Sequence, residues 1–269
     1  MTKLPPDFKS FMLNSQNKQQ LIRFLLTEWK SEKYARHLFG RDVYFVCETE
    51  CCCLTSDGII TTVTDITTLH SHQEEADMRI ILHALFVATT APADRTVIVR
   101  SVIVRSPDTD VMILLLSYAN KIQLPLIFDT GSGNKRRLID IQSTAAAFGT
   151  EMCSCLPAIY AFTGSDYTSA FVRRGKVKRL QLLQHNNQFI KVFSQFGLQP
   201  ELDPNNFTGI ERFVCCMYSR QSYSDVNRLR FDLFQSRYEL KADFQKLRVS
   251  DGIDVSLLPL CRNSLMMHT

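Results

Sequence analysis

A short motif between two apolar runs constrains this chain more than any other feature. The run Val97 to Val104 is rich in β-branched residues and predicts a buried strand, and Val111 to Leu116 predicts the start of a helix. Between them stands Ser106-Pro107-Asp108-Thr109-Asp110, in which the proline ends the strand. Two carboxylates therefore lie at a strand-to-helix corner, where open α/β sheets collect ligands and catalytic groups. A structural interpretation stays open, because Asp108 or Thr109 can cap the helix and Asp110 suits its dipole.

The sequence of the predicted strand before this motif contains a tandem repeat. Val97-Ile98-Val99-Arg100-Ser101 is followed directly by Val102-Ile103-Val104-Arg105-Ser106. Because five is an odd number, the second copy reverses the inward and outward parity of the first. We therefore expect one copy to form the strand that precedes Asp108, and the other to lengthen the strand, bulge or loop out.

The composition excludes several classes of protein. The 269 residues are 45% hydrophobic and 22% charged, which is ordinary for one large or two small globular domains. No apolar run reaches the roughly 18 residues of a membrane span, and the first residues lack the apolar core of a signal peptide. The nine cysteines are odd in number and clumped, which favours a reducing compartment. We expect an intracellular protein that does not enter the membrane, with the nucleus as one option.

Acidic residues also occur at two other element boundaries. Glu74, Glu75 and Asp77 open a helix predicted over Gln73 to Thr89, and Asp166 stands in the glycine turn Thr163 to Tyr167. Acidic residues in a first turn also suit the helix dipole, so a structural role is available for them. Clustered carboxylates repel one another without a cation, whereas Mg²⁺ or Mn²⁺ takes oxygen ligands. Two such ions can activate water and stabilise the leaving oxygen of a phosphodiester.

Basic residues are more concentrated than the net charge of +4 suggests. They form two clusters, one of Lys135, Arg136 and Arg137, the other of Arg173, Arg174, Lys176, Lys178 and Arg179. Such clusters are typical of contacts with a phosphate backbone, and also of a solvated helix face.

The order of predicted elements indicates the fold class. Strands are expected at 43–47, 59–63, 97–104, 125–129 and 138–141, and helices at 17–29, 73–89, 111–119, 143–148, 152–162, 177–184, 189–196, 210–218 and 226–238. Strands and helices that alternate, followed by helices alone, predict an α/β core with a helical C-terminal part. We divide the chain into an N-terminal helical segment (1–40), a core (41–185) and a C-terminal helical region (186–269).

Three motifs carry a resemblance to a known family. Glu75-Ala76-Asp77, Ser106-Pro107-Asp108-Thr109-Asp110 and Gly164-Ser165-Asp166-Tyr167 resemble, in that order, the internal region of the flap endonuclease/XPG-type nucleases of the PIN-like superfamily. More closely, residues 70 to 185 resemble uncharacterised PIN-like proteins of animal genomes that are often tied to mobile elements. The resemblance implies a three-layer PIN-like core with a mainly parallel central sheet. It also implies a Mg²⁺- or Mn²⁺-dependent nuclease that acts on nucleic acid, with DNA expected.

The resemblance assigns roles to residues of this chain. It makes Glu75, Asp77, Asp108, Asp110 and Asp166 the catalytic metal ligands, and places Ala170 to Leu183 on the DNA backbone. The family supplies a further aspartate from an N-terminal strand, which this sequence does not show near residue 1. We therefore expect that strand to be missing. Two hypotheses follow: a metal-dependent nuclease, and a catalytically inactive module that binds nucleic acid or a partner.

Two smaller motifs give further alternatives. Phe128-Asp129-Thr130-Gly131 matches the signature of aspartic proteases, which need two aspartates that share a proton and here a symmetric dimer. The structural alternative is a hairpin turn in which Asp129 accepts hydrogen bonds from backbone amides. Cys47, Cys51 and Cys53 could contribute to a zinc site, or they are buried or idle thiols.

Overall fold

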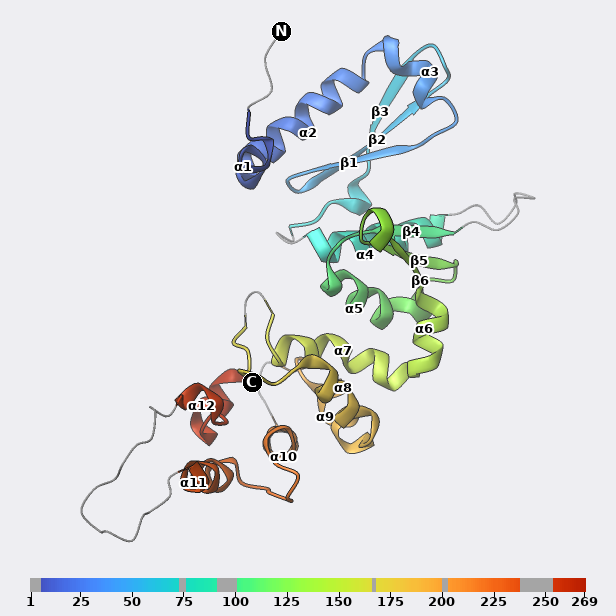
Figure 1. The fold of residues 1–269 in the computed structure, drawn as a ribbon. Helices are drawn as coiled ribbons and strands as arrows, with labels where there is room; N and C mark the ends of the chain where they lie inside the picture. Colours follow the sequence, from blue (N-terminus) through green and yellow to red (C-terminus); the bar gives the residue numbers. More distant parts are fainter. Residues whose placement is uncertain (1–5, 73–75, 91–100, 166–167, 200–202, 238–253) are drawn as a thin grey trace. The chain divides into compact units, whose positions relative to one another are not determined.

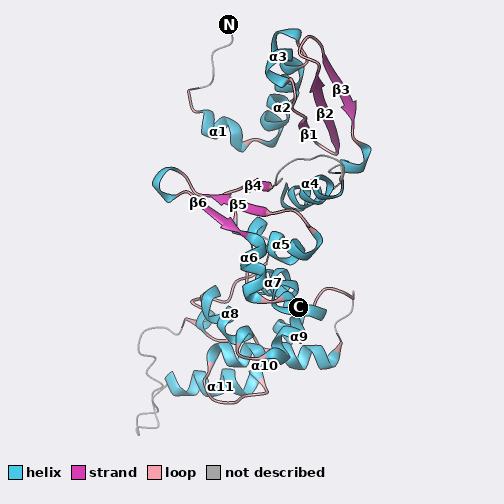
Figure 2. Cartoon of the chain, turned by 90° about the vertical axis from the view of Figure 1, so that its right-hand side faces the viewer, coloured by secondary structure: helices cyan, strands magenta, loops and turns pink. Residues whose placement is uncertain are grey.

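The computed structural model describes residues 6–72, 76–90, 101–165, 168–199, 203–237 and 254–269 (Figure 1). The chain divides into two compact units, Met1–Asp94 and Arg95–Thr269. Each unit contains its own three-stranded sheet, and the described residues from 141 onward are helical wherever they form regular structure (Figure 2). The described residues include no helix that is long and apolar enough to cross a membrane.

The first unit combines helices with an antiparallel sheet in the order β1-β2-β3. Its elements are α1 (Phe8–Leu13), α2 (Ser15–Trp29), η1 (Glu32–Tyr34), α3 (Ala35–Leu38), β1 (Val43–Cys47), β2 (Glu50–Ser56), β3 (Thr61–Asp65), η2 (Thr67–Leu69) and α4 (Ala76–Thr90). Trp29 of α2 packs edge-on against Phe45 of β1, with ring centroids 5.5 Å apart. Tyr44 packs against Phe86 of α4 in the same way at 5.9 Å.

The cysteine-rich segment forms the central strand of this sheet. Cys51 and Cys53 of β2 are buried on one face, opposite Val46 and Tyr44 of β1. Burial raises the pKa of the Cys51 thiol to about 11, which keeps it protonated and poorly suited to bind metal. Within the part of the chain that the structure describes, these thiols therefore support the interpretation as buried side chains.

The second unit begins with a mixed sheet and continues as a helical bundle. Its strands are β4 (Val102–Arg105), β5 (Leu126–Thr130) and β6 (Arg137–Asp140). Its helices are α5 (Thr109–Tyr118), η3 (Ala119–Lys121), η4 (Gly133–Lys135), α6 (Ile141–Phe148), α7 (Thr150–Phe162), α8 (Lys176–Gln184), α9 (Asn187–Gln195), α10 (Pro204–Tyr218), α11 (Val226–Arg237), η5 (Val255–Leu257) and α12 (Arg262–His268).

The sheet of the second unit is smaller than the expected one. β4 runs parallel to β5, with α5 as the crossover between them, and β6 turns back antiparallel to β5. A mixed α/β fold is therefore confirmed, but the described residues show no large, mainly parallel central sheet. The second copy of the repeat, Val102–Arg105, forms β4, whereas residues 97–100 of the first copy lie outside the described residues.

Aromatic side chains form the core of the helical bundle. The ring of Phe162, at the end of α7, lies 5.4 Å from those of Phe171 and Phe193 and 6.4 Å from that of Phe213. α10 is anchored by a buried carboxylate, Glu211, which accepts a hydrogen bond from the Val226 backbone at the start of α11. Aromatic packing thus fixes the positions of α7, α9 and α10 relative to one another.

Candidate nucleic-acid interface

The strand-to-helix corner has the predicted geometry. β4 ends at Arg105, and α5 begins after Asp108, whose Oδ1 accepts a hydrogen bond from the Asp110 backbone at 3.0 Å. The buried Ser106 hydroxyl in turn accepts from the Asp108 backbone at 3.1 Å. Asp108 is exposed and Asp110 is half-buried. The capping role of Asp108 is therefore observed, and both carboxylates lie at the carboxyl end of a parallel strand.

The other predicted metal ligands lie either in the first unit or outside the described residues. Asp77 lies in the first turn of α4, in the first unit, and is engaged in an interaction there. Glu75 and Asp166 lie outside the described residues. No group of three or more His, Cys, Asp or Glu side chains that could hold a metal ion is found in the described part of the chain. The five-residue acidic cluster therefore stays a prediction.

The chemistry of the corner suits one magnesium ion better than two. Asp108 and Asp110 offer hard oxygen ligands, and one or two carboxylates with water are enough for Mg²⁺. A two-metal site needs more acidic ligands than these two residues provide. One oxygen of Asp108 is also occupied by the helix cap.

The Asp129-Thr130-Gly131 segment is held by arginines instead of backbone amides. The Asp129 carboxylate is only 2% exposed. It accepts hydrogen bonds from Arg105 Nη1 at 2.7 Å and from Nε and Nη2 of Arg136, both at 2.9 Å. The hydrogen bond from Arg136, followed by that from Arg105, lowers the pKa of Asp129 to about 2. An aspartate ionised so firmly has no proton to share, so this geometry gives no support to the protease alternative.

The two predicted basic clusters differ in how their side chains are used. Lys135 and Arg137 are exposed where β5 leads into β6, whereas Arg136 is tied to Asp129. In the second cluster Arg173 and Lys178 are exposed, and the Lys176 ammonium lies 3.2 Å from the centroid of the Tyr160 ring.

Arg179 is the exception, because it is 3% exposed. Its guanidinium donates to the Thr163 carbonyl at 2.7 Å and to the Phe171 carbonyl at 3.1 Å. Arg179 therefore braces the glycine turn that follows α7, and the structure favours a supporting role for it over direct contact with DNA.

The second cluster, except Lys176, lines a cleft of about 440 Å³ between α8 and the end of α10. We call this the basic cleft. Its lining carries the charged or titratable residues Arg173, Arg174, Lys178, Arg179, Arg220, His185, Cys216 and Tyr218, and contains no aspartate or glutamate. Among the described residues, Arg173, Lys178 and Arg220 take part in no ion pair. The cleft is therefore an uncompensated concentration of positive charge.

Arg174 and Tyr218 form one wall of the basic cleft. The Arg174 guanidinium lies 4.1 Å from the centroid of the Tyr218 ring and donates to the Met217 carbonyl at 3.1 Å. Burial, and to a lesser degree the charge of Arg174, lowers the pKa of Arg179. These like charges repel each other, and a bound anion would offset that repulsion.

Arg220 was not predicted from the sequence, because it is isolated among polar residues and lies far along the chain from Arg173. Its only sequence signal is its place directly after the apolar stretch of α10. Packing of α8 against α10 brings it to the same cleft.

Comparisons with protein-family models, with curated proteins and with solved structures gave no match to this chain. The PIN-like resemblance thus rests on the three sequence motifs alone.

Proposed function

We propose that this chain binds nucleic acid, and that the basic cleft holds part of the phosphate backbone. The observation that carries the proposal is the cleft itself, where cationic side chains from two separate stretches converge without a carboxylate. Nucleic-acid backbones are recognised mainly by such unpaired Lys and Arg side chains. Arg174 is held in place by its contact with Tyr218, so less entropy is lost when it binds a phosphate.

The proposal also draws on the PIN-like resemblance. In that resemblance, the segment Ala170 to Leu183 grips the DNA backbone, and the basic cleft is built largely from this segment. The observed parallel pair β4–β5 with its crossover helix is compatible with a PIN-like core. We propose DNA as the preferred nucleic acid, on the resemblance alone.

Binding can be tested by fluorescence anisotropy with matched single-stranded DNA, duplex DNA and single-stranded RNA, each with hydroxyl ends. The double variant Arg173→Glu, Lys178→Glu should weaken binding by at least about tenfold, because it reverses two exposed charges in the cleft. The matched control Lys121→Glu, Lys191→Glu changes the net charge equally at exposed positions outside the cleft lining, and should retain most of the affinity. Equal losses in the two double variants would contradict the proposal.

A second candidate function is metal-dependent hydrolysis of phosphodiester bonds. The observation that favours it is the pair Asp108 and Asp110 at the carboxyl end of the parallel strand β4. When bound there, Mg²⁺ would polarise a phosphate oxygen or activate a water molecule. The residues of this chain would hold the ion and, through the basic cleft, the strand to be cut.

Hydrolysis can be tested with flap, hairpin and single-stranded DNA in the presence of Mg²⁺ or Mn²⁺. Asp108→Asn and Asp110→Asn should each reduce cleavage by about 100-fold or more if these carboxylates hold the ion. The Asp108→Asn variant keeps a capping side chain on α5, so its loss would report the charge and not the helix. Cleavage by both variants at the wild-type rate would exclude this function and leave the binding proposal untouched.

A further inference from the structure

We infer that the basic cleft is a pocket for a terminal phosphate, that is, for the phosphomonoester at the end of a strand or on a free nucleotide. This inference deepens the proposed function and rests on it for the strand as ligand. It assigns to the cleft a group that is chemically different from the phosphodiesters along the backbone.

The size of the cleft suits a single nucleotide. A volume of about 440 Å³ lies within the range of about 300–1,000 Å³ found for small-molecule pockets. Leu182, Met217 and Tyr218 contribute apolar or aromatic surface beside the cations. One phosphate and its attached sugar or base can thus be accommodated.

The charge of the cleft suits a dianion. A phosphate monoester carries about −1.5 to −2 charges at pH 7, whereas each internal phosphodiester carries about −1. The lining holds Arg173, Arg174, Lys178, Arg179 and Arg220 without any carboxylate. Arginine guanidiniums bind phosphate oxygens through two parallel hydrogen bonds, so several of them can share the exposed oxygens of a terminal phosphate.

Backbone N–H groups at the start of α8 have unused capacity to donate hydrogen bonds. Gly175, which precedes α8, lines the cleft, and no side chain caps the backbone N–H groups of the first helical turn there. Arg179 lines the cleft as well, but its Nε is buried and its Nη1 and Nη2 already donate to backbone carbonyls, so it contributes positive charge and no direct contact.

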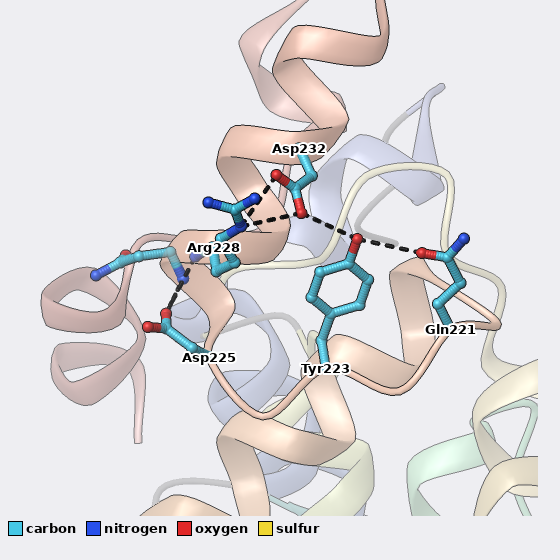
Figure 3. A network of polar contacts seen from close by, with 6 residues as sticks. Gln221, Tyr223, Asp225, Arg228 and Asp232 are labelled. Carbon is cyan, nitrogen blue, oxygen red and sulfur yellow. Dashed lines mark hydrogen bonds and ion pairs between the residues drawn. The ribbon is translucent and has the colours of Figure 1, made fainter.

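The chain also fixes the segment that carries Arg220. Figure 3 shows the polar network just after it, in which the Tyr223 hydroxyl donates to the Asp232 carboxylate at 3.1 Å and lies 3.3 Å from Gln221 Oε1. Arg228 forms an ion pair with Asp232 at 3.2 Å, which holds the acceptor in place. Arg220 therefore extends from an ordered connection between α10 and α11. A pocket that binds one defined group needs its cationic side chains held in place in this way.

The inference can be tested by isothermal titration calorimetry in a phosphate-free buffer. The ligands are one DNA strand with a 5′-phosphate, the same strand with a 3′-phosphate, the strand with hydroxyl ends, and adenosine monophosphate. We expect a terminal phosphate at one of the two ends to tighten binding by about tenfold over the hydroxyl strand, as one added charge-assisted contact would. If the phosphorylated strand binds more tightly than adenosine monophosphate, the pocket recognises the end of a strand. If the two affinities are equal, the pocket recognises a free nucleotide.

Variants link that preference to the cleft. Arg220→Gln should reduce the ratio between phosphorylated and hydroxyl strands to about twofold or less, because it removes a donor from the pocket. Arg212→Gln, an exposed position on α10 outside the lining, loses the same charge and should keep the ratio. Both positions are exposed, so thermal unfolding should be unchanged and serves as the check on folding.

The outcomes separate the two proposals. Equal affinity for phosphorylated and hydroxyl strands, with no binding of the mononucleotide, would overturn the terminal-phosphate pocket while nucleic-acid binding stands. If adenosine monophosphate binds and none of the DNA strands does, the proposed function is contradicted and the cleft is a nucleotide site. Binding of neither would refute both.

Discussion

At the scale of single residues, Asp129 belongs to a protease-like sequence motif, but its surroundings give it a structural role. Its carboxylate lies at the end of β5, beside Arg105 at the end of β4 and Arg136 just before β6. Both arginine side chains are more than half exposed, whereas the Asp129 side chain is buried. The two arginines thus bring their charge to a buried acid from the solvent side, and the three residues tie β4, β5 and the approach to β6 together.

The first prediction concerns the pH dependence of this network. Asp129→Asn should lower the melting temperature at pH 7 by several degrees, because the arginines lose their acceptor. A carboxyl group with a lowered pKa in the folded state stabilises the fold above its ordinary pKa and loses that contribution as the pH falls. For Asp129 the pKa falls from 3.8 to about 2, so the difference between wild type and variant should shrink between about pH 4 and pH 2.

Circular dichroism melting curves over this pH range would measure the effect. Asp42→Asn, at an exposed position, is the matched control for the loss of one negative charge. A difference that stays constant from pH 7 down to pH 2 would show that the ionised form of Asp129 does not stabilise the fold.

Residue roles were only partly predictable from the charge pattern. The sequence marks Arg136, Arg173 and Arg179 alike as basic residues in clusters, but one of them pairs with a buried acid, one is exposed and one is buried. The difference comes from partners distant in the sequence, such as the Thr163 carbonyl for Arg179. A charge run indicates where cations gather and not which of them reach a ligand.

At the scale of elements, the corner between β4 and α5 combines a structural and a proposed chemical role. Asp108 caps α5 and Asp110 stands in its first turn, as helix physics favours. Capping uses one oxygen of Asp108 and therefore does not exclude metal binding by the other.

The second prediction separates the two roles. Asp108→Ala should reduce the free energy of unfolding by about 1 kcal/mol, because α5 loses its capping side chain. Asp108→Asn should change it by only a few tenths of that, because asparagine caps equally well. Urea denaturation of both variants measures the difference, and equal destabilisation would show that the negative charge, and not the hydrogen bond, matters for the fold.

Local patterns located most elements, and tertiary context decided the rest. The apolar spacing in 17–29 and the run of valine and aromatic residues in 43–47 coincide with α2 and β1 to within two residues. β2 was not predicted, because Cys51 to Cys53 give no alternating pattern and the strand is stabilised by its two neighbours. The size of each sheet could not be read from strand segments, because pairing depends on contacts between distant parts of the chain.

At the scale of the whole molecule, the distribution of charge matters more than its sum. A net charge of +4 over 269 residues would give only weak, diffuse attraction to a polyanion. The basic cleft instead concentrates cations from 173–179 and from Arg220 on the second unit. Proposals for diffuse and for local binding therefore differ in how strongly salt should weaken the complex.

The third prediction uses this difference. The affinity for single-stranded DNA should fall with rising salt along a slope of log K against log salt of about −3, because about four cations of the cleft reach solvent. Each of Arg173→Gln, Lys178→Gln and Arg220→Gln should reduce the steepness of that slope by somewhat less than one, whereas Lys191→Gln on α9 should not change it. Anisotropy titrations at several salt concentrations give the slope directly. A wild-type slope near −1, or a slope that Lys191→Gln reduces as much as Arg220→Gln, would show that the net charge attracts the strand and that the cleft does not bind it.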